Sequence, residues 1–154
     1  MNVIYSTLDD FEAWIALARQ VEPLFGSMAD EAPFRDALKG AISNREAFCI
    51  RPLPGEKQTI LKGGIVVSKA SNEILWFAVS EKDRRKGYGR QLLLFAIDHL
   101  HRREKILVET FAATVGAGQS ARKLYLDCGF VDETTGGINP AGVPTVIMQL
   151  SGLP

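Results

Sequence analysis

The sequence predicts a mixed α/β (α+β) fold: a largely antiparallel sheet with a central parallel strand pair and helices on both faces. Two amphipathic helical segments come first, and short strands with short connections follow. From about residue 73 the pattern alternates between apolar strands and amphipathic helices. With 154 residues, 46% of them hydrophobic, the chain is expected to form a single domain over 1–154 with a sizeable core.

Two helices are predicted in the first third of the chain. Apolar residues recur at helical spacing over 11–22, after an acidic pair that can cap a helix, and Pro23 and Gly26 are expected to end it. A second helix is predicted over 33–42, because a proline suits the first helical turn and the apolar residues that follow share one face.

The rest of the chain supplies the sheet. The predicted strands are 47–51, 59–68, 73–79, 105–111, 131–134 and 145–150, and the helices among them are 87–101 and 120–127. Short connections up to residue 79 predict antiparallel neighbours. Strands 73–79 and 105–111 are nearly continuous apolar runs joined through a helix, which is typical of a parallel pair covered on both faces.

The charge balance and the cysteines exclude several classes of protein. Lys plus Arg and Asp plus Glu number 18 each, so no net field attracts the chain to nucleic acid or to a membrane surface. The sequence has neither an apolar run of the roughly 18 residues of a membrane span nor a signal peptide, which predicts a cytoplasmic protein. Cys49 and Cys128 are far apart and no Cys or His spacing suits a metal, so we expect reduced thiols and no metal site.

A basic, glycine-rich turn is the most informative feature of the sequence. The run Arg84-Arg85-Lys86-Gly87-Tyr88-Gly89-Arg90 follows a predicted strand and opens a predicted helix. Glycines let backbone N–H groups approach an anion, and the first turn of a helix offers free donors and the positive end of its dipole. So many cations at a helix start are unfavourable unless something negative lies among them. The turn therefore predicts a phosphate site, with a solvated basic loop as the alternative.

The spacing of the glycines excludes two common phosphate-binding motifs. A Walker A loop ends in Gly-Lys-Ser/Thr, and a Rossmann fingerprint has a third glycine three residues after the second. Gly89 is followed by Arg90-Gln91-Leu92, so neither motif is present. The remaining pattern, Arg84-x-x-Gly87-x-Gly89 directly after a strand, resembles the acetyl-CoA-binding motif of the GNAT (N-acetyltransferase) superfamily.

A second block further along the chain resembles the other signature of the same superfamily. Leu124-Tyr125 lies on a predicted helix that closes on Gly129-Phe130, and a glycine commonly ends a helix in the left-handed region. With the elements between the two blocks, the resemblance extends over roughly residues 63–150. One position departs. Family members often have Asn where this chain has Gly118, so that contact with the pantetheine arm is missing or falls to Gln119 or Ser120.

The resemblance implies acetyl-CoA as co-substrate and a site for it. The pantetheine arm is expected to pair with the backbone where the central strand bulges, over 77–79, and the pyrophosphate to lie on the amides of 85–90. The residues expected to bind acetyl-CoA are Phe77, Ala78, Val79, Arg84, Arg85, Lys86, Gly87, Tyr88, Gly89, Arg90 and Ser120.

The resemblance also implies which residues move protons. Tyr125 matches the tyrosine that the family uses to protonate the leaving CoA thiolate, and a phenol of pKa about 10 suits a thiolate of pKa about 8.5. Glu73 is the candidate base, because the strand that it begins is similar to that of the histone-acetylating branch, where a Glu at this offset deprotonates the amine through water. Glu73 can equally be an exposed residue at the mouth of a hairpin. Glu109, near the end of the next strand, is the reserve candidate.

The expected acceptor is a primary amine, on a small molecule or a peptide, that approaches over residues 24–31. Phe25 and Met28 either line its pocket or pack inside, and Asp30 and Glu31 would hold an ammonium group. The predicted function is transfer of acetyl from acetyl-CoA to this amine by direct attack in a ternary complex. The alternative is a CoA-binding regulatory or interaction module without catalysis, of which Gly118 would be a sign. The oligomeric state, a homodimer included, stays open.

Overall fold

The computed structural model describes residues 3–57 and 59–154 and folds them into one seven-stranded sheet. The strands are β1 (Ile4–Tyr5), β2 (Ala47–Ile50), β3 (Gly63–Ser68), β4 (Glu73–Val79), β5 (Ile106–Phe111), β6 (Val131–Ile138) and β7 (Pro144–Leu150). Their order is β1-β2-β3-β4-β5-β7-β6, and among these described neighbours β4 and β5 alone are parallel. The predicted sheet, largely antiparallel with a central parallel pair, is confirmed.

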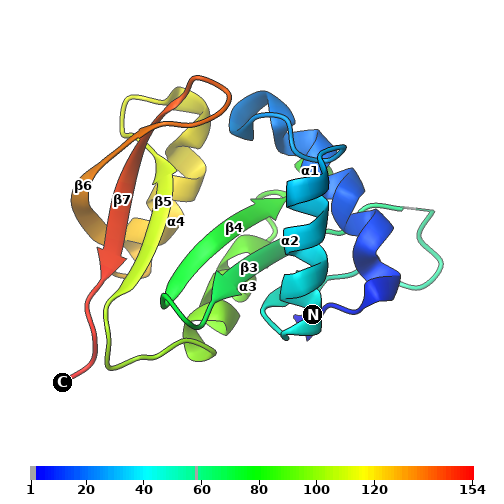
Figure 1. Ribbon diagram of the computed structural model, residues 1–154, viewed down its shortest axis with the longest axis horizontal. Coiled ribbons are helices and arrows are strands. Elements are labelled where there is room, and N and C mark those ends of the chain that lie inside the picture. Colours follow the sequence, from blue (N-terminus) through cyan, green and yellow to red (C-terminus); the bar gives the residue numbers. More distant parts are fainter. Residues whose placement is uncertain (1–2, 58) are drawn as a thin grey trace.

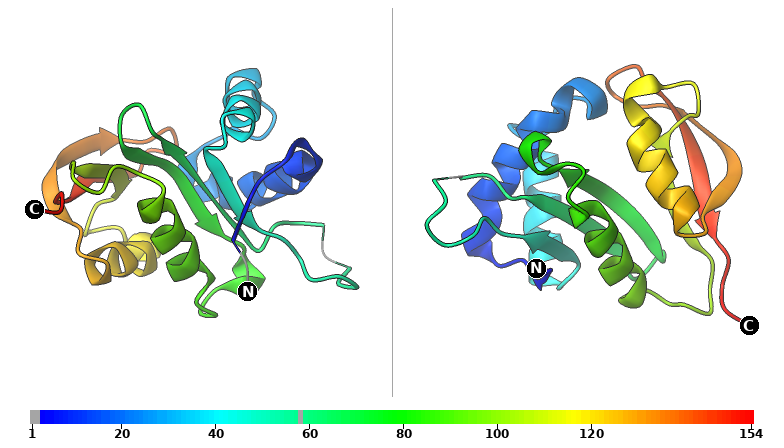
Figure 2. Two further views of the ribbon diagram at one scale, coloured as in Figure 1. Left: turned by 90° about the horizontal axis from the view of Figure 1, so that it is seen from below. Right: turned by 180° about the vertical axis from the view of Figure 1, so that it is seen from behind.

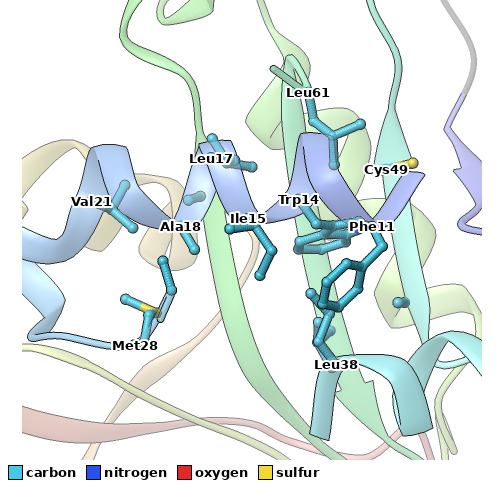
Figure 3. Packing of buried hydrophobic residues seen from close by; sticks show 14 of the residues in the cluster. Phe11, Trp14, Ile15, Leu17, Ala18, Val21, Met28, Leu38, Cys49 and Leu61 are labelled. Atoms are coloured by element: carbon cyan, nitrogen blue, oxygen red, sulfur yellow. The ribbon is translucent and has the colours of Figure 1, made fainter. Parts of the chain in front are cut away.

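Helices cover both faces of the sheet, as predicted. Those of the described residues are α1 (Phe11–Phe25), α2 (Ala32–Ser43), α3 (Tyr88–Asp98) and α4 (Gln119–Asp127). Helices α1 and α2 lie on one face, and α3 and α4 lie on the other (Figure 2). The first face buries Trp14 completely, among side chains of α1 that gather with Leu38 of α2 and Cys49 of β2 (Figure 3). The other face buries Leu92 of α3 with Phe130, so each layer has its own apolar core.

The first helix runs further than predicted, because Pro23 does not end it. A proline removes one N–H donor, and in the last turn of a helix that loss affects a single internal hydrogen bond. Gly26 ends the helix as predicted: its φ is 103°, and its N–H bonds the Glu22 carbonyl at 2.8 Å.

Other boundaries differ by a few residues. The predicted strand 59–68 begins only at Gly63, and position 58 lies outside the described residues. The predicted helix 87–101 ends at Asp98, whereas β6 continues past the predicted end at residue 134. Strand β1 was not predicted, since two residues are too few for a periodic pattern.

The parallel strands β4 and β5 open into a V. They pair at Glu73 with Leu107 and at Ile74 with Val108, and beyond this point the two described strands diverge (Figure 1). The facing edges of both strands therefore leave backbone N–H and C=O groups for another partner.

A β-bulge lies in β4 at Leu75. On the neighbouring strand β3, Val67 pairs with Ile74 and Val66 pairs with Trp76, so Leu75 is an extra residue. The bulge reverses the alternation of side chains: Ile74 packs in the core of α3 and α4, and Trp76 packs against the core of α1 and α2. The expected bulge over 77–79 is therefore wrong.

Candidate active site

A cavity of about 260 Å³ lies between the splayed parts of β4 and β5. We call it the β4–β5 cavity. Its lining comes from six elements: Phe25 of α1, Ile74 to Phe77 of β4, Val108 to Phe111 of β5, Ala121 and Tyr125 of α4, Asn139 of the β6–β7 turn, and Thr145 of β7. Residues from all parts of the chain thus meet where the strands separate.

The basic turn adjoins this cavity at the end of β4. Arg85 has φ 62° and Gly87 has φ 85°, so two left-handed residues alternate just before α3 begins at Tyr88. Turns with left-handed residues are among the places where backbone N–H groups converge on an anion. A left-handed arginine is strained by roughly 1–2 kcal/mol, and such strain is found at functional turns.

The turn rests on a buried carboxylate. Asp83 is 2% exposed, accepts a short hydrogen bond from the Ser80 hydroxyl and has the ammonium groups of Lys62 and Lys86 at 3.8 and 3.4 Å. The Asp83 carboxylate forms an ion pair with Lys86, and the side chains of Arg85 and Lys86 are both exposed. The buried Asp83 thus fixes the start of the turn, and the cationic side chains that follow it are exposed to solvent.

The two glycines of the turn have different structural roles. Gly87 needs its positive φ, and no described atom would lie within 4 Å of a Cβ built there. Gly89 needs the close approach: a Cβ would lie 3.2 Å from a Leu124 methyl carbon and 3.5 Å from the Phe77 ring. The start of α3 therefore packs directly against one wall of the β4–β5 cavity.

The remaining expected acetyl-CoA residues lie in the turn, in β4 and at the start of α4. Arg84 donates from Nε to the Val79 carbonyl at 3.4 Å, and Arg90 is exposed in the first turn of α3. Ala78 is buried in the part of β4 that diverges from β5, and Ser120 is exposed in the first turn of α4. The ring of Tyr88 lies 5.4 Å from the Lys62 ammonium.

The departure at Gly118 has a steric cause. A Cβ at this position would lie 2.4 Å from the Phe111 Cβ and 2.7 Å from two of its ring carbons. The aromatic side chain of β5 thus fills the place where an asparagine would begin. Gln119 donates to the carbonyls of Ala113 and Val115, so its amide holds the local turn.

Tyr125 lines the cavity and is 3% exposed. Burial raises the pKa of its hydroxyl above the usual value of a tyrosine. The phenol therefore stays neutral at physiological pH and can act as a hydrogen-bond donor. Its ring packs edge-on against Phe77 of β4 and Phe130.

The two candidate bases lie in different environments. Glu109 lines the cavity, and its carboxylate accepts a hydrogen bond from the Thr145 hydroxyl at 2.7 Å. Gly136 makes this pair possible, since a Cβ there would lie 2.4 Å from the Thr145 oxygen. Glu73 is the first residue of β4, where it accepts a bond from Ser71 at 2.9 Å, and it is not among the lining residues of the described cavity. The bulge at Leu75 also means that Glu73 does not share a face with Phe77, contrary to simple alternation.

The four residues expected to contact the acceptor also lie in different environments. Phe25 lines the cavity, whereas Met28 is buried and accepts the Trp76 indole N–H on its sulfur at 3.3 Å. Asp30 forms a two-point ion pair with Arg19, at 2.7 and 2.9 Å, and these hydrogen bonds hold the pKa of Asp30 below its usual value. Glu31 is exposed just before α2.

Sequence reasoning missed several lining residues, among them Trp76, Phe111, Asn139 and Thr145. Asn139 with the proline after it is a typical turn signal. No local signal, however, indicates which distant residue such a turn will contact.

The described residues contain no cluster of three His, Cys, Asp or Glu side chains that could hold a metal ion. Within the same residues, no helix is long and apolar enough to cross a membrane.

A parallel strand pair that splays beside a basic, glycine-containing turn is the arrangement expected of an acyl-CoA transferase fold. The family model described as an acetyltransferase (GNAT) domain matches residues 54–132, just over half of the chain. The chain belongs to the GNAT family. Comparison with curated protein sequences gives no match.

Solved structures support the fold over nearly the whole chain. An acetyltransferase of the GNAT family from Bacillus cereus aligns with a TM-score of 0.72 and 19% identity, over 99% of this chain and 98% of that one. The ribosomal-protein-S18-alanine N-acetyltransferase from Escherichia coli aligns with a TM-score of 0.71 and 18% identity, over 99% and 95%. The NatC complex bound to Gag peptide and CoA aligns with a TM-score of 0.70 and 20% identity, over 99% and 100%. At these identities the similarity shows the fold alone.

Proposed function

We propose that this protein transfers the acetyl group of acetyl-CoA to a primary amine by direct attack within a ternary complex. One observation carries the proposal: the β4–β5 cavity is lined by both a carboxylate that can accept a proton, Glu109, and a neutral phenol, Tyr125. Its wall also packs against the start of α3, where the basic turn ends. GNAT membership and relatives that acetylate proteins or bind CoA support it.

The residues around the turn fit acetyl-CoA. The turn that contains Arg85 and Gly87 would offer backbone N–H groups to a pyrophosphate, and the exposed cations beside it would offset its charge. The unpaired edge of β4 beyond Ile74 offers hydrogen bonds to the pantetheine amides. Because Phe111 occupies the place of the family's asparagine, Ser120 is the remaining side chain that we assign to this arm.

Acetyl-CoA supplies the thioester when it is bound, and transfer forms a C–N bond and breaks the C–S bond. We assign to Glu109 the proton that the amine loses, directly or through water, because its carboxylate lines the cavity and Thr145 orients it. We assign to Tyr125 a hydrogen bond to the departing sulfur and the proton that this sulfur takes up; Tyr125 then regains a proton from Glu109 through water. Its raised pKa keeps the phenol neutral before the reaction, as a hydrogen-bond donor requires. Glu73 remains the other candidate base, acting through water.

A CoA-binding module without catalysis is the second candidate, and Gly118 is the observation that favours it. The packing of Phe111 at this position removes a side chain that relatives often use on the pantetheine arm.

A panel of primary amines, monitored by free-thiol release and by mass of the acetylated product, separates the two functions. We expect acetyl-CoA consumption that depends on the amine. Binding of acetyl-CoA without consumption over the whole panel would support the module and contradict the transferase.

A further inference from the structure

A second hollow adjoins the β4–β5 cavity on the side of α2. It has a volume of about 370 Å³ and lies between one face of α2 and the strands β3 and β4; we call it the α2 groove. Leu75 and Trp76 line both hollows, so the two hollows adjoin at these side chains. The bulge exposes 55% of the Leu75 side chain at this junction.

The α2 groove offers mainly apolar contact. Most of its lining side chains are apolar, among them Phe34, Ala37, Leu38, Ala41, Val66 and Leu75. The single charged residue among the described lining residues is Glu46, whose carboxylate already accepts the backbone N–H of Lys69 at 2.7 Å. An apolar group gains by burial here, at about 25 cal/mol per Å², and Glu46 is the one charge that a polar group would meet in the described lining.

The opposite side of the β4–β5 cavity is closed by the tip of the β6–β7 hairpin. Asn139 donates from Nδ2 to the Leu24 carbonyl at 3.0 Å, and Pro140 packs so closely on Gly26 that a Cβ there would lie 2.6 Å away. We call these contacts the hairpin latch. In Figure 1 this hairpin reaches over the open end of the V toward the end of α1.

Aromatic rings continue the closure below the latch. The Phe25 ring lies 5.6 Å from that of Phe111 and 5.7 Å from that of Trp76, so the rings connect β5 to β4 through α1. An acceptor that reaches Glu109 therefore meets aromatic walls and the latch on one side and the α2 groove on the other.

From this arrangement we infer that the acceptor is a compact amine on an apolar body, which lies in the α2 groove and directs its nitrogen to Glu109. The inference rests on the proposed function and narrows its substrate class. The latch excludes acceptors that continue as a polypeptide from the nitrogen-bearing residue. In such an acceptor the apolar side chain would occupy the α2 groove, so the rest of the polypeptide would have to leave on the side that the latch closes.

The groove is tested by Gly40→Leu. Gly40 lines the α2 groove, and no described atom lies within 4 Å of a Cβ built there, so the backbone accepts a side chain at this position. We expect the KM for 2-phenylethylamine to rise about tenfold relative to that for ethanolamine, which corresponds to 1.4 kcal/mol of lost contact. Ser43→Leu, which adds the same side chain to α2 outside the lining, should leave the ratio of the two KM values unchanged. Equal changes for both amines, or none, would overturn the inference.

The latch is tested by Asn139→Asp. This isosteric change keeps the oxygen that accepts the N–H groups of Ala141 and Val143 but replaces the donor to the Leu24 carbonyl by a second oxygen. For a hexapeptide that begins with phenylalanine, we expect kcat/KM relative to 2-phenylethylamine to be low in the natural protein and to rise about fivefold in the variant, the factor for one hydrogen bond. Equal use of peptide and amine by the natural protein would refute a closing role for the latch.

Calorimetry keeps this inference separate from the proposed function. If acetyl-CoA binds and no amine is acetylated, the transferase proposal fails. The CoA-saturated protein is then titrated with 2-phenylethylamine: binding that Gly40→Leu weakens would support the groove. Absent binding, or binding that the substitution leaves unchanged, would contradict it.

Discussion

Alanine at two glycines of one short turn should change stability in opposite directions. Gly116 and Gly118 are the first and last residues of the 3-10 turn before α4, and neither has a positive φ. Glycine-to-alanine changes at such positions usually stabilise by about 0.4–1 kcal/mol, because alanine reduces the entropy of the unfolded chain. We expect this gain for Gly116→Ala, since no described atom lies within 4 Å of the new Cβ.

The expected sign reverses at Gly118, because Phe111 leaves no space. Carbon atoms in good contact are about 3.5–4 Å apart, and the new Cβ would lie 2.4 Å from the Phe111 Cβ. That atom is attached to the β5 backbone, so rotation of the ring cannot relieve the clash and the chain itself has to move. Overpacking of this kind costs about 1–3 kcal/mol, and we expect about 2 kcal/mol for Gly118→Ala.

Urea denaturation and thermal unfolding of the two variants at one pH measure the difference. Gly118→Ala should lower the free energy of unfolding and reduce Tm by about 4–8 °C, the shift for about 2 kcal/mol in a domain of this size. Gly118→Asn, which restores the common residue of the family, should be destabilised at least as much. If Gly118→Ala is as stable as Gly116→Ala, the steric account of this departure from the family pattern is wrong.

Three further predictions concern the site. Tyr125→Phe should lower kcat by about 10²-fold and leave the KM for acetyl-CoA nearly unchanged, as thiol release would show; full kcat would contradict the acid role. Glu109→Gln should flatten the acidic limb of the kcat/KM profile, because that limb reports ionisation of the base in the free enzyme, whereas Glu73→Gln should keep it; the reverse result would return the role to Glu73. Arg90→Glu should reduce the thermal stabilisation that acetyl-CoA confers while the ligand-free Tm stays within about 2 °C, since the side chain is exposed, and an unchanged shift would remove Arg90 from the phosphate site.

Local pattern predicted most elements because their signals are local. The apolar runs of β4 and β5 and the helix between them identify a parallel crossover without knowledge of any distant contact. The misplaced boundaries also have local causes. Pro23 removes one donor near a helix end, where few bonds depend on it, and the bulge at Leu75 has no side-chain signature because leucine is common in regular strands.

The sequence by itself determined the family, the sheet class, the basic turn and Tyr125, since each depends on residues that lie close together in the chain and form a recognisable pattern. Only the tertiary structure decided which side chains share the β4–β5 cavity. It brought Glu109 into the cavity and left Glu73 at a hairpin, paired Asp30 with Arg19, and joined Asn139 to Leu24 across 115 positions. Contacts over such separations depend on how the strands splay and the loops meet, which no local periodicity encodes.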